Sequence, residues 1–302
     1  MQLKTIFSAL ALSTLFVSAD AQQIFRISQY TQHNFLYNPA AAGANKDASI
    51  GATYRKMWTG IDGGPQTVML YGDTYFEKQK TGLGVAVYND ETGPTSRTGG
   101  LIDLSYSIKL GEEGQRLMLG LSGMVLQYKV DMEAVTPYLE NDAVLASSGS
   151  VTKGDMGAGI YLNTPTINLG ASVQQIIQPK LGLVKESGGY ATGQLYRHYF
   201  FVASYNWKTD EDNVVIPNAL VKYSWRTPVD VEVGARLEHK DFIWVGFNYH
   251  YQQSFSGYAG VKIDHKFAIG YAYDQYSTPL SIFDQGGGAG HELTLRYFFV
   301  KK

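Results

Sequence analysis

The sequence predicts an all-β protein in which about 14 antiparallel strands close into a transmembrane β-barrel. Three observations support this class. Apolar and polar residues alternate in many runs, the connections between these runs are alternately long and short, and no run of 18 or more apolar residues follows the amino-terminal one. A membrane helix would need roughly 20 apolar residues. The chain is therefore expected to cross a membrane with strands.

The final run, 290–299, shows the alternation most clearly. Its apolar residues fall on one face of a strand of period two, and its polar residues fall on the other. The apolar face ends in aromatic rings, which suit a lipid boundary. We expect this strand to close the barrel. Its apolar face consists of Leu293, Leu295, Tyr297 and Phe299, and its polar face consists of Glu292, Thr294 and Arg296.

Thirteen further runs alternate in the same way. In the run 229–237 a charged residue stands at nearly every second position, which excludes a strand buried on both faces. Alternation alone does not identify the solvent on the apolar face, so a soluble β-sandwich is the alternative fold. The predicted strands cover residues 48–56, 67–76, 81–89, 98–110, 116–130, 153–163, 166–177, 197–207, 214–225, 229–237, 242–250, 255–263, 267–274 and 290–299.

The connection lengths favour the barrel over the sandwich. Bacterial barrels have long outer loops, short periplasmic turns and an even number of strands, so we expect both termini on the periplasmic side of an outer membrane. The connection 226–228 is the exception, since it is short where a long one is expected. The long connections are 57–66, 90–97, 131–152, 178–196 and 275–289, and the short ones are 77–80, 111–115, 164–165, 208–213, 238–241 and 264–266.

The amino-terminal part divides into two segments. Residues 1–21 have one early positive charge, an apolar run and the small residues Ala19 and Ala21, which predict a signal peptide cleaved before Gln22. A membrane-anchoring helix is the alternative, but the run is too short to span a bilayer. Residues 22–47 lack clean alternation and are predicted to be a periplasmic pre-barrel segment. The barrel itself is expected over 48–302.

The pre-barrel segment carries too many apolar side chains to remain in water. We therefore expect it to dock against the barrel, either inside the lumen or along the periplasmic mouth. A filled lumen and an open one remain alternatives, because the inward faces of the strands carry charges of both signs. The apolar residues of the segment are Phe25, Ile27, Tyr30, Phe35, Leu36 and Tyr37, and the expected lumen charges are Asp103, Lys109, Lys222, Asp230, Glu232, Arg236 and Arg296.

Composition excludes several classes of function. The 302 residues carry a net charge of −2 with 25 basic and 27 acidic side chains, so no footprint for nucleic acid is present. The absence of cysteine removes disulfides, thiol catalysis and thiolate metal sites. The 33 glycines and 22 tyrosines are both abundant, as expected where strands coil and rings lie at a headgroup boundary.

The sequence offers no catalytic, cofactor or metal site. No two of the six histidines have metal-ligand spacing on a predicted strand face. The triple glycine at 286–288 precedes a strand and lacks the lysine of a phosphate-binding loop. Calcium binding by Asp62, Asp90 and Glu91 is the weaker alternative to solvated loop carboxylates. We therefore expect no enzyme, although a hydrolase site assembled across strands is not excluded by sequence.

Several motifs together resemble the PorP/SprF-like family of outer-membrane proteins, found in bacteria with type IX secretion and gliding motility. The resemblance covers nearly all of the expected mature chain, and the sequence departs from the family pattern at Ala41 and at Thr31 to His33. The motifs are Ser28-Gln29-Tyr30, Tyr37-Asn38-Pro39-Ala40 with Ala42-Gly43, Tyr54-Arg55 with Trp58, Gly60, Ile61, Gly64-Pro65 and Thr67, Gly82-Leu83-Gly84 with Asn89-Asp90 and Gly93-Pro94, and Gly290-His291-Glu292-Leu293 with Leu295 and Tyr297.

The resemblance implies a barrel that works with the type IX secretion system to secrete or anchor a particular large surface protein, such as an adhesin used in gliding. Its implied partners are outer-membrane lipid, type IX components and the secreted protein or its carboxy-terminal domain. A passive porin for small solutes is the alternative. Aromatic and apolar loop residues are the expected partner contacts: Tyr138, Tyr190, Tyr196, Tyr276, Leu280 and Phe283. The residues expected to shape the fold are Asn38, Pro39, Gly43, Arg55, Trp58, Gly64 and Pro65.

Overall fold

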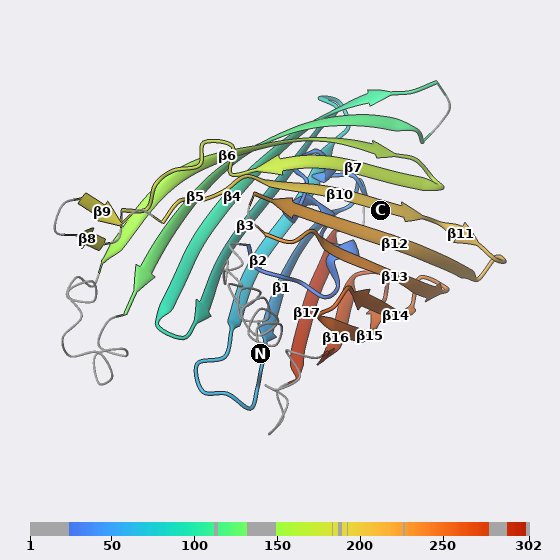
Figure 1. Ribbon diagram of the computed structural model, residues 1–302. Helices are drawn as coiled ribbons and strands as arrows, with labels where there is room; N and C mark the ends of the chain where they lie inside the picture. Colours follow the sequence, from blue (N-terminus) through green and yellow to red (C-terminus); the bar gives the residue numbers. More distant parts are fainter. Residues whose placement is uncertain are drawn as a thin grey trace, which may run out of the picture.

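A computed structural model describes residues 24–111, 114–131, 149–182, 184–186, 189–191, 193–225, 227–277 and 289–299. Over these residues, 14 antiparallel strands form one closed barrel (Figure 1). The strands are β1 (Ala48–Lys56), β2 (Gln66–Phe76), β3 (Thr81–Thr92), β4 (Thr95–Lys109), β5 (Arg116–Val130), β6 (Ser150–Asn163), β7 (Ile167–Gln174), β10 (His198–Tyr205), β12 (Asn213–Ser224), β13 (Asp230–His239), β14 (Ile243–His250), β15 (Ser254–Ile263), β16 (Phe267–Tyr276) and β17 (Gly290–Phe299).

Each strand of the barrel pairs with its neighbours in sequence, and the last pairs with the first. β17 lies antiparallel to β1, with Ala48 opposite Phe299 and Lys56 opposite His291. The prediction that the final strand closes the barrel is confirmed. Three short strands add to this pattern: β11 (Trp207–Lys208) extends the pairing beside β12, and β8 (Val184–Glu186) forms a separate hairpin with β9 (Gly189–Ala191).

The two faces of the strands divide as the alternation predicts. In β17 the Leu295 side chain is 46% exposed on the outer surface, whereas Glu292 is fully buried on the inner one. Val233 and Glu232 of β13 differ in the same way. Because each backbone group in such a ring pairs with a neighbouring strand, the outer surface can face hydrocarbon. No helix among the described residues is long and apolar enough to cross a membrane.

The connections fall at two ends of the barrel, which differ in length. We call the end with connections 57–65, 131–149 and 175–197 the loop end, and the opposite end, with 77–80, 164–166 and 264–266, the turn end. One predicted long loop is wrong: β3 and β4 continue to Thr92 and Thr95, so only Gly93 and Pro94 connect them. The strands are longer there because polar residues at the rim still pair across the hairpin.

The segment before β1, residues 24–47, lies inside the ring of strands (Figure 1). We call it the lumen segment. It contains three short 3₁₀ helices, η2 (Tyr30–Gln32), η3 (Asn34–Leu36) and η4 (Pro39–Ala41). The description of residues 22–47 as a periplasmic segment is therefore corrected for the described part, which occupies the lumen. This is one of the two docked positions that the apolar content predicted.

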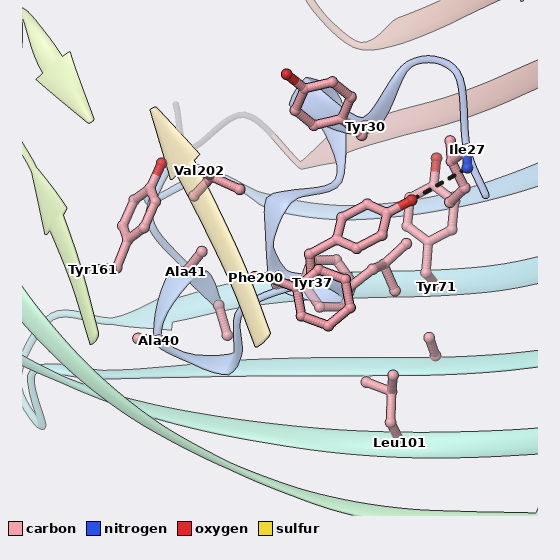
Figure 2. Close-up of a cluster of buried hydrophobic side chains, with 14 of the residues drawn as sticks. Ile27, Tyr30, Tyr37, Ala40, Ala41, Tyr71, Leu101, Tyr161, Phe200 and Val202 are labelled. Carbon is pink, nitrogen blue, oxygen red and sulfur yellow. Dashed lines mark hydrogen bonds between the residues drawn. The ribbon is translucent and has the colours of Figure 1, made fainter. Parts of the chain in front are cut away.

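The apolar side chains of the lumen segment form the largest buried cluster of the described molecule. Tyr37 packs on Phe200 of β10 with ring centroids 5.5 Å apart, and its hydroxyl accepts a hydrogen bond of 3.2 Å from the Ile27 backbone N–H (Figure 2). Tyr71 of β2 and Tyr161 of β6 enter the same cluster from the wall. The barrel thus has a packed interior where a porin of larger strand number has water.

The two ends of the described chain lie at opposite ends of the barrel. Phe299 pairs with Ala48 at the turn end, where β1 begins. The Phe25 ring packs at a tilt on Tyr88 of β3, with ring centroids 4.7 Å apart, in the half of that strand nearest the loop end. The lumen segment thus separates residues 24 and 299 along the barrel axis, and the side of a membrane on which each terminus lies stays a prediction. The expected signal peptide lies outside the described residues.

Candidate functional site

The lumen is the candidate site, because the residues that the family motifs singled out meet there. The lumen segment descends from Phe25 towards the turn end, returns at η3 and descends again through η4 into β1. Figure 2 shows this folded path between the walls. It brings two stretches of the segment, 26–32 and 36–44, against two different parts of the wall.

The η4 helix packs directly on the backbone of the wall. A Cβ atom added at Gly120 of β5 would lie 2.1 Å from the backbone nitrogen of Ala40, and one added at Gly82 of β3 would lie 1.9 Å from the carbonyl oxygen of Ala42. Real side chains never approach backbone atoms so closely, so these positions accept only glycine. Part of the high glycine content therefore makes room for the lumen segment.

The Asn38-Pro39 pair explains why the segment turns where it does. Asn38 is the N-cap of η4, where its Oδ1 accepts a hydrogen bond of 3.0 Å from the Ala40 backbone N–H. Pro39 occupies the first helical position, where a backbone N–H would lack a partner. The Nδ2 of Asn38 donates at 3.0 Å to the carbonyl of Ile160 in β6. Gly43 then adopts φ of +68°, which favours glycine.

Side chains of the wall donate to the backbone carbonyls that the lumen segment leaves open. This matters because an unpaired carbonyl in a dry interior is unfavourable by about 1–3 kcal/mol. Four polar residues of β4 to β7 provide the donors. They are Ser105 to the oxygen of Ala42 at 2.7 Å, Arg116 to Ala44, Ser172 to Tyr37 at 2.5 Å and Gln174 to Leu36 at 2.9 Å.

Charged residues hold the other stretch, around Ser28. Glu292 of β17 accepts hydrogen bonds from the backbone N–H groups of Ser28 at 2.6 Å and Gln29 at 3.1 Å. Arg55 of β1 forms ion pairs with Glu292 at 3.1 Å and with Asp274 of β16 at 2.5 Å. Arg55 also donates to the Ser28 hydroxyl. The lumen segment is thereby bound at the seam where the first and last strands meet.

Two further charged contacts lie on either side of this network. Arg26 donates to Ser254 at 2.9 Å and lies 3.8 Å from the carboxylate of Glu232. Towards the turn end, Arg296 donates at 2.6 Å to the carbonyl of Gln32 and pairs with Asp73 at 3.1 Å. Of the expected lumen charges, Lys109 is instead exposed at the end of β4. Glu232 and Arg296 thus contact the lumen segment, whereas Lys222 pairs with Asp230 and Arg236 pairs with Glu238 within the wall.

The motif around Trp58 builds the rim at the loop end. The connection 57–65 folds on itself, with the Met57 N–H donating to Pro65 at 2.8 Å. A Cβ atom at Gly64 would lie 2.7 Å from the carbonyl oxygen of Met57, so the turn requires glycine there. Trp58 packs on the Tyr276 ring at 6.3 Å. Trp58, Gly64 and Pro65 thus shape a compact rim.

The residues expected to contact a partner lie in different kinds of structure. Tyr276 is wrongly placed by the loop prediction: β16 extends through it, and its side chain is 4% exposed because it faces inward beside Trp58. Tyr196 is partly exposed in the 175–197 connection, and Tyr190 belongs to β9. Tyr138, Leu280 and Phe283 lie outside the described residues. Tyr196 therefore stays a prediction, whereas Tyr276 is a structural residue.

The lumen segment leaves two cavities inside the barrel, one towards each end. At the turn end a polar cavity of about 430 Å³ is bounded by Tyr30 and Thr31 of the lumen segment and by Arg236 and Trp244 of the wall. At the loop end a cavity of about 40 Å³ lies beside Phe25. Among the described residues, no group of three or more histidines and acids is placed to hold a metal ion. The segment separates these two spaces.

The decisive comparison is with protein families. The model of the type IX secretion system membrane protein PorP/SprF matches residues 19–297, which include the whole described barrel and lumen segment apart from the last residues of β17. The chain belongs to this family. The matched range covers the Asn38, Arg55 and Glu292 positions described above. No curated protein matches the chain.

This PorP/SprF protein is similar to several solved structures at low sequence identity. The toluene transporter TbuX of Ralstonia pickettii is 12% identical, with a TM-score of 0.50 over 88% of this chain and 93% of that one. The outer membrane protein Omp33 of Acinetobacter baumannii is 8% identical, with a TM-score of 0.48 over 84% and 98% of the two chains. The toluene transporter TodX of Pseudomonas putida gives 10%, 0.47, 91% and 94%. The likeness to TbuX concerns the fold.

Sequence reasoning missed how these charges are used. It placed Glu292 on the polar face of the last strand, but it did not connect this residue with Ser28, Arg55 or Asp274. The signal was present in the motifs themselves, since Ser28-Gln29, Tyr54-Arg55 and Gly290-His291-Glu292 were all singled out separately. Their shared contact appears only once β1 and β17 are paired.

Proposed function

We propose that this PorP/SprF protein is an outer-membrane component that works with the type IX secretion system to secrete or anchor a specific large surface protein. The observation that carries the proposal is the lumen segment. The chain's own segment occupies the interior of the barrel and is hydrogen-bonded to β17 on one side and to β7 on the other, which favours a fixed interior. Solute passage would require those contacts to break.

The rim supplies a surface for the partner in this proposal. The connection 57–65 is fixed to both of its neighbours, because the Gly93 N–H donates to Gly63 at 2.8 Å and the Thr59 N–H donates to Ala289 at 3.3 Å. A rim tied in this way presents a preorganised surface, which lowers the entropic penalty of binding. The described residues of the 175–197 connection would extend it.

A pull-down from outer membranes tests the proposal. The tagged protein is solubilised in mild detergent, and the proteins recovered with it are identified by mass spectrometry. We expect a large secreted protein or type IX components. A matched control carries a disrupted 57–65 turn, Gly64→Val, and should lose the secreted protein while keeping the heat-modifiable mobility of a folded barrel.

The porin alternative makes the opposite prediction. A passive pore would give steady single-channel conductance in planar bilayers, and deletion of the gene would slow the entry of small solutes. In our proposal, purified protein conducts little, and deletion removes one or a few large proteins from the cell surface. Conductance together with an empty pull-down would overturn the proposal in favour of the porin.

A further inference from the structure

The amino-terminal end of the lumen segment lies at the loop end of the barrel, not at the end where β1 begins. Phe25 packs on Tyr88, which stands four residues before the loop-end terminus of β3. Arg26 donates to Ser254, the first residue of β15 at the same end. Ile24 and Phe25 border the cavity that Arg97 and Leu195 also line. Independent contacts with several strands thus give the same position.

The contacts with the wall also fix the direction in which the lumen segment runs along the barrel. The segment is bonded to the wall in order, with Ser28 at Glu292, Gln32 at Arg296 and Asp47 directly before β1 at the turn end. From Glu292 to Arg296, β17 advances towards the turn end at about 3.3 Å per residue. The chain before Ser28 therefore continues towards the loop end.

We propose that the amino terminus of the mature protein is presented at the outer surface of the outer membrane. Cleavage before Gln22 would leave only two residues ahead of Ile24, and two extended residues span at most roughly 7 Å. β3 alone has 12 residues, so it is several times longer than that reach. The mature amino group therefore stays on the side of the long connections, which face outward in bacterial barrels.

This position gives the outward surface a chain end as well as loops. A secreted protein that sits on the rim, as in the proposed function, would meet the mature amino terminus there. The contact with a secreted protein rests on the proposed function, whereas the outward position of the amino terminus rests only on the contacts of the lumen segment. Ser28 is bonded to the closing strand β17, and the chain before Ser28 continues from there towards the loop end. The strands must therefore close into a barrel around the lumen segment.

The absence of cysteine allows a direct test in intact cells. Three single-cysteine variants are compared with a membrane-impermeant maleimide: Ile24→Cys, Gln252→Cys in the exposed 251–253 turn at the loop end, and Glu211→Cys in the exposed 206–212 connection at the turn end. We expect the first two to react in intact cells and the third only after the outer membrane is permeabilised. Heat-modifiable mobility verifies that each variant folds.

Reaction of Ile24→Cys only after permeabilisation, with Gln252→Cys reacting in intact cells, would overturn the proposal. Ile24 is partly buried, so a second variant carries a protease site inserted between Gln23 and Ile24. Cleavage by external protease supports the outward end, whereas cleavage only from the periplasm, or none in the folded protein, overturns it. The pull-down of partners uses the unmodified protein and does not depend on the labelling or protease result. Failure of the outward amino terminus is therefore distinguishable from failure of the proposed function.

Discussion

The lumen segment is held by two walls that use different physics. β3 to β7 contact residues 36–44 through close steric fit, in which glycines admit the chain. Ser105, Ser172, Gln174 and the charged Arg116 donate to its carbonyls. β1 and β13 to β17 contact residues 26–32 through buried charges, with Arg55, Asp274 and Glu292 at the centre. We call these the steric wall and the charged wall.

The difference shows what each wall can tolerate. A close fit to backbone atoms has no room for relaxation, so any added carbon must move the chain. A charged network can lose geometry gradually, but removing one partner leaves an uncompensated buried charge. We therefore expect the steric wall to fail by expelling the segment and the charged wall to fail by losing stability.

The largest effect is expected for Gly120→Val on the steric wall. Its Cβ would overlap the backbone of Ala40, so η4 must leave its position. We expect rapid protease clipping of the lumen segment in the folded barrel, together with increased single-channel conductance. Gly123→Val is the matched control, because a Cβ there meets nothing within 4 Å and points outward. Equal behaviour of the two variants would contradict the steric role.

A somewhat smaller effect is expected for Arg55→Met on the charged wall. Asp274 and Glu292 would both lose their counter-ion in a site with no exposure, which typically costs about 3–5 kcal/mol. Urea unfolding followed by heat-modifiable mobility measures the change. Arg55→Lys should fall between, since it keeps the charge but loses the fork of donors. Lys240→Met, in an exposed pair with Asp212, should change nothing measurable.

Both walls show what the sequence could and could not predict. Alternation located all 14 strands, because one face must meet lipid and the other must not. It also placed Glu292 and Arg296 inward correctly. It could not show that their partners lie in residues 26–32, since contacts between strand and lumen segment depend on barrel closure and not on local pattern. Tyr276 was assigned to a loop for a related reason. β16 continues through Tyr276, whose ring packs on Trp58, and local alternation does not show that contact.

A moderate effect is expected at Asn38, where the steric wall depends on a single side chain. Asn38→Ala removes the N-cap of η4, which typically costs about 0.5–2 kcal/mol. Asn38→Asp keeps the acceptor for Ala40 but replaces the donor to Ile160 with a buried charge. We therefore expect Asp to be more destabilising than Ala in urea unfolding. The reverse order would mean that the cap, and not the bond to β6, fixes the segment.

The smallest effect is expected for Tyr37→Phe, which tests whether the two walls are coupled. The Tyr37 hydroxyl accepts from the Ile27 N–H and so joins the stretch on the steric wall to the stretch on the charged wall. Removing one such hydrogen bond costs about 0.5–1.5 kcal/mol, while the ring can keep its packing on Phe200. If the walls act independently, the losses of Tyr37→Phe and Arg55→Lys should add in the double variant. If the bond transmits between them, the double variant should lose less than the sum, because either change alone already loosens residues 26–28 from their neighbours.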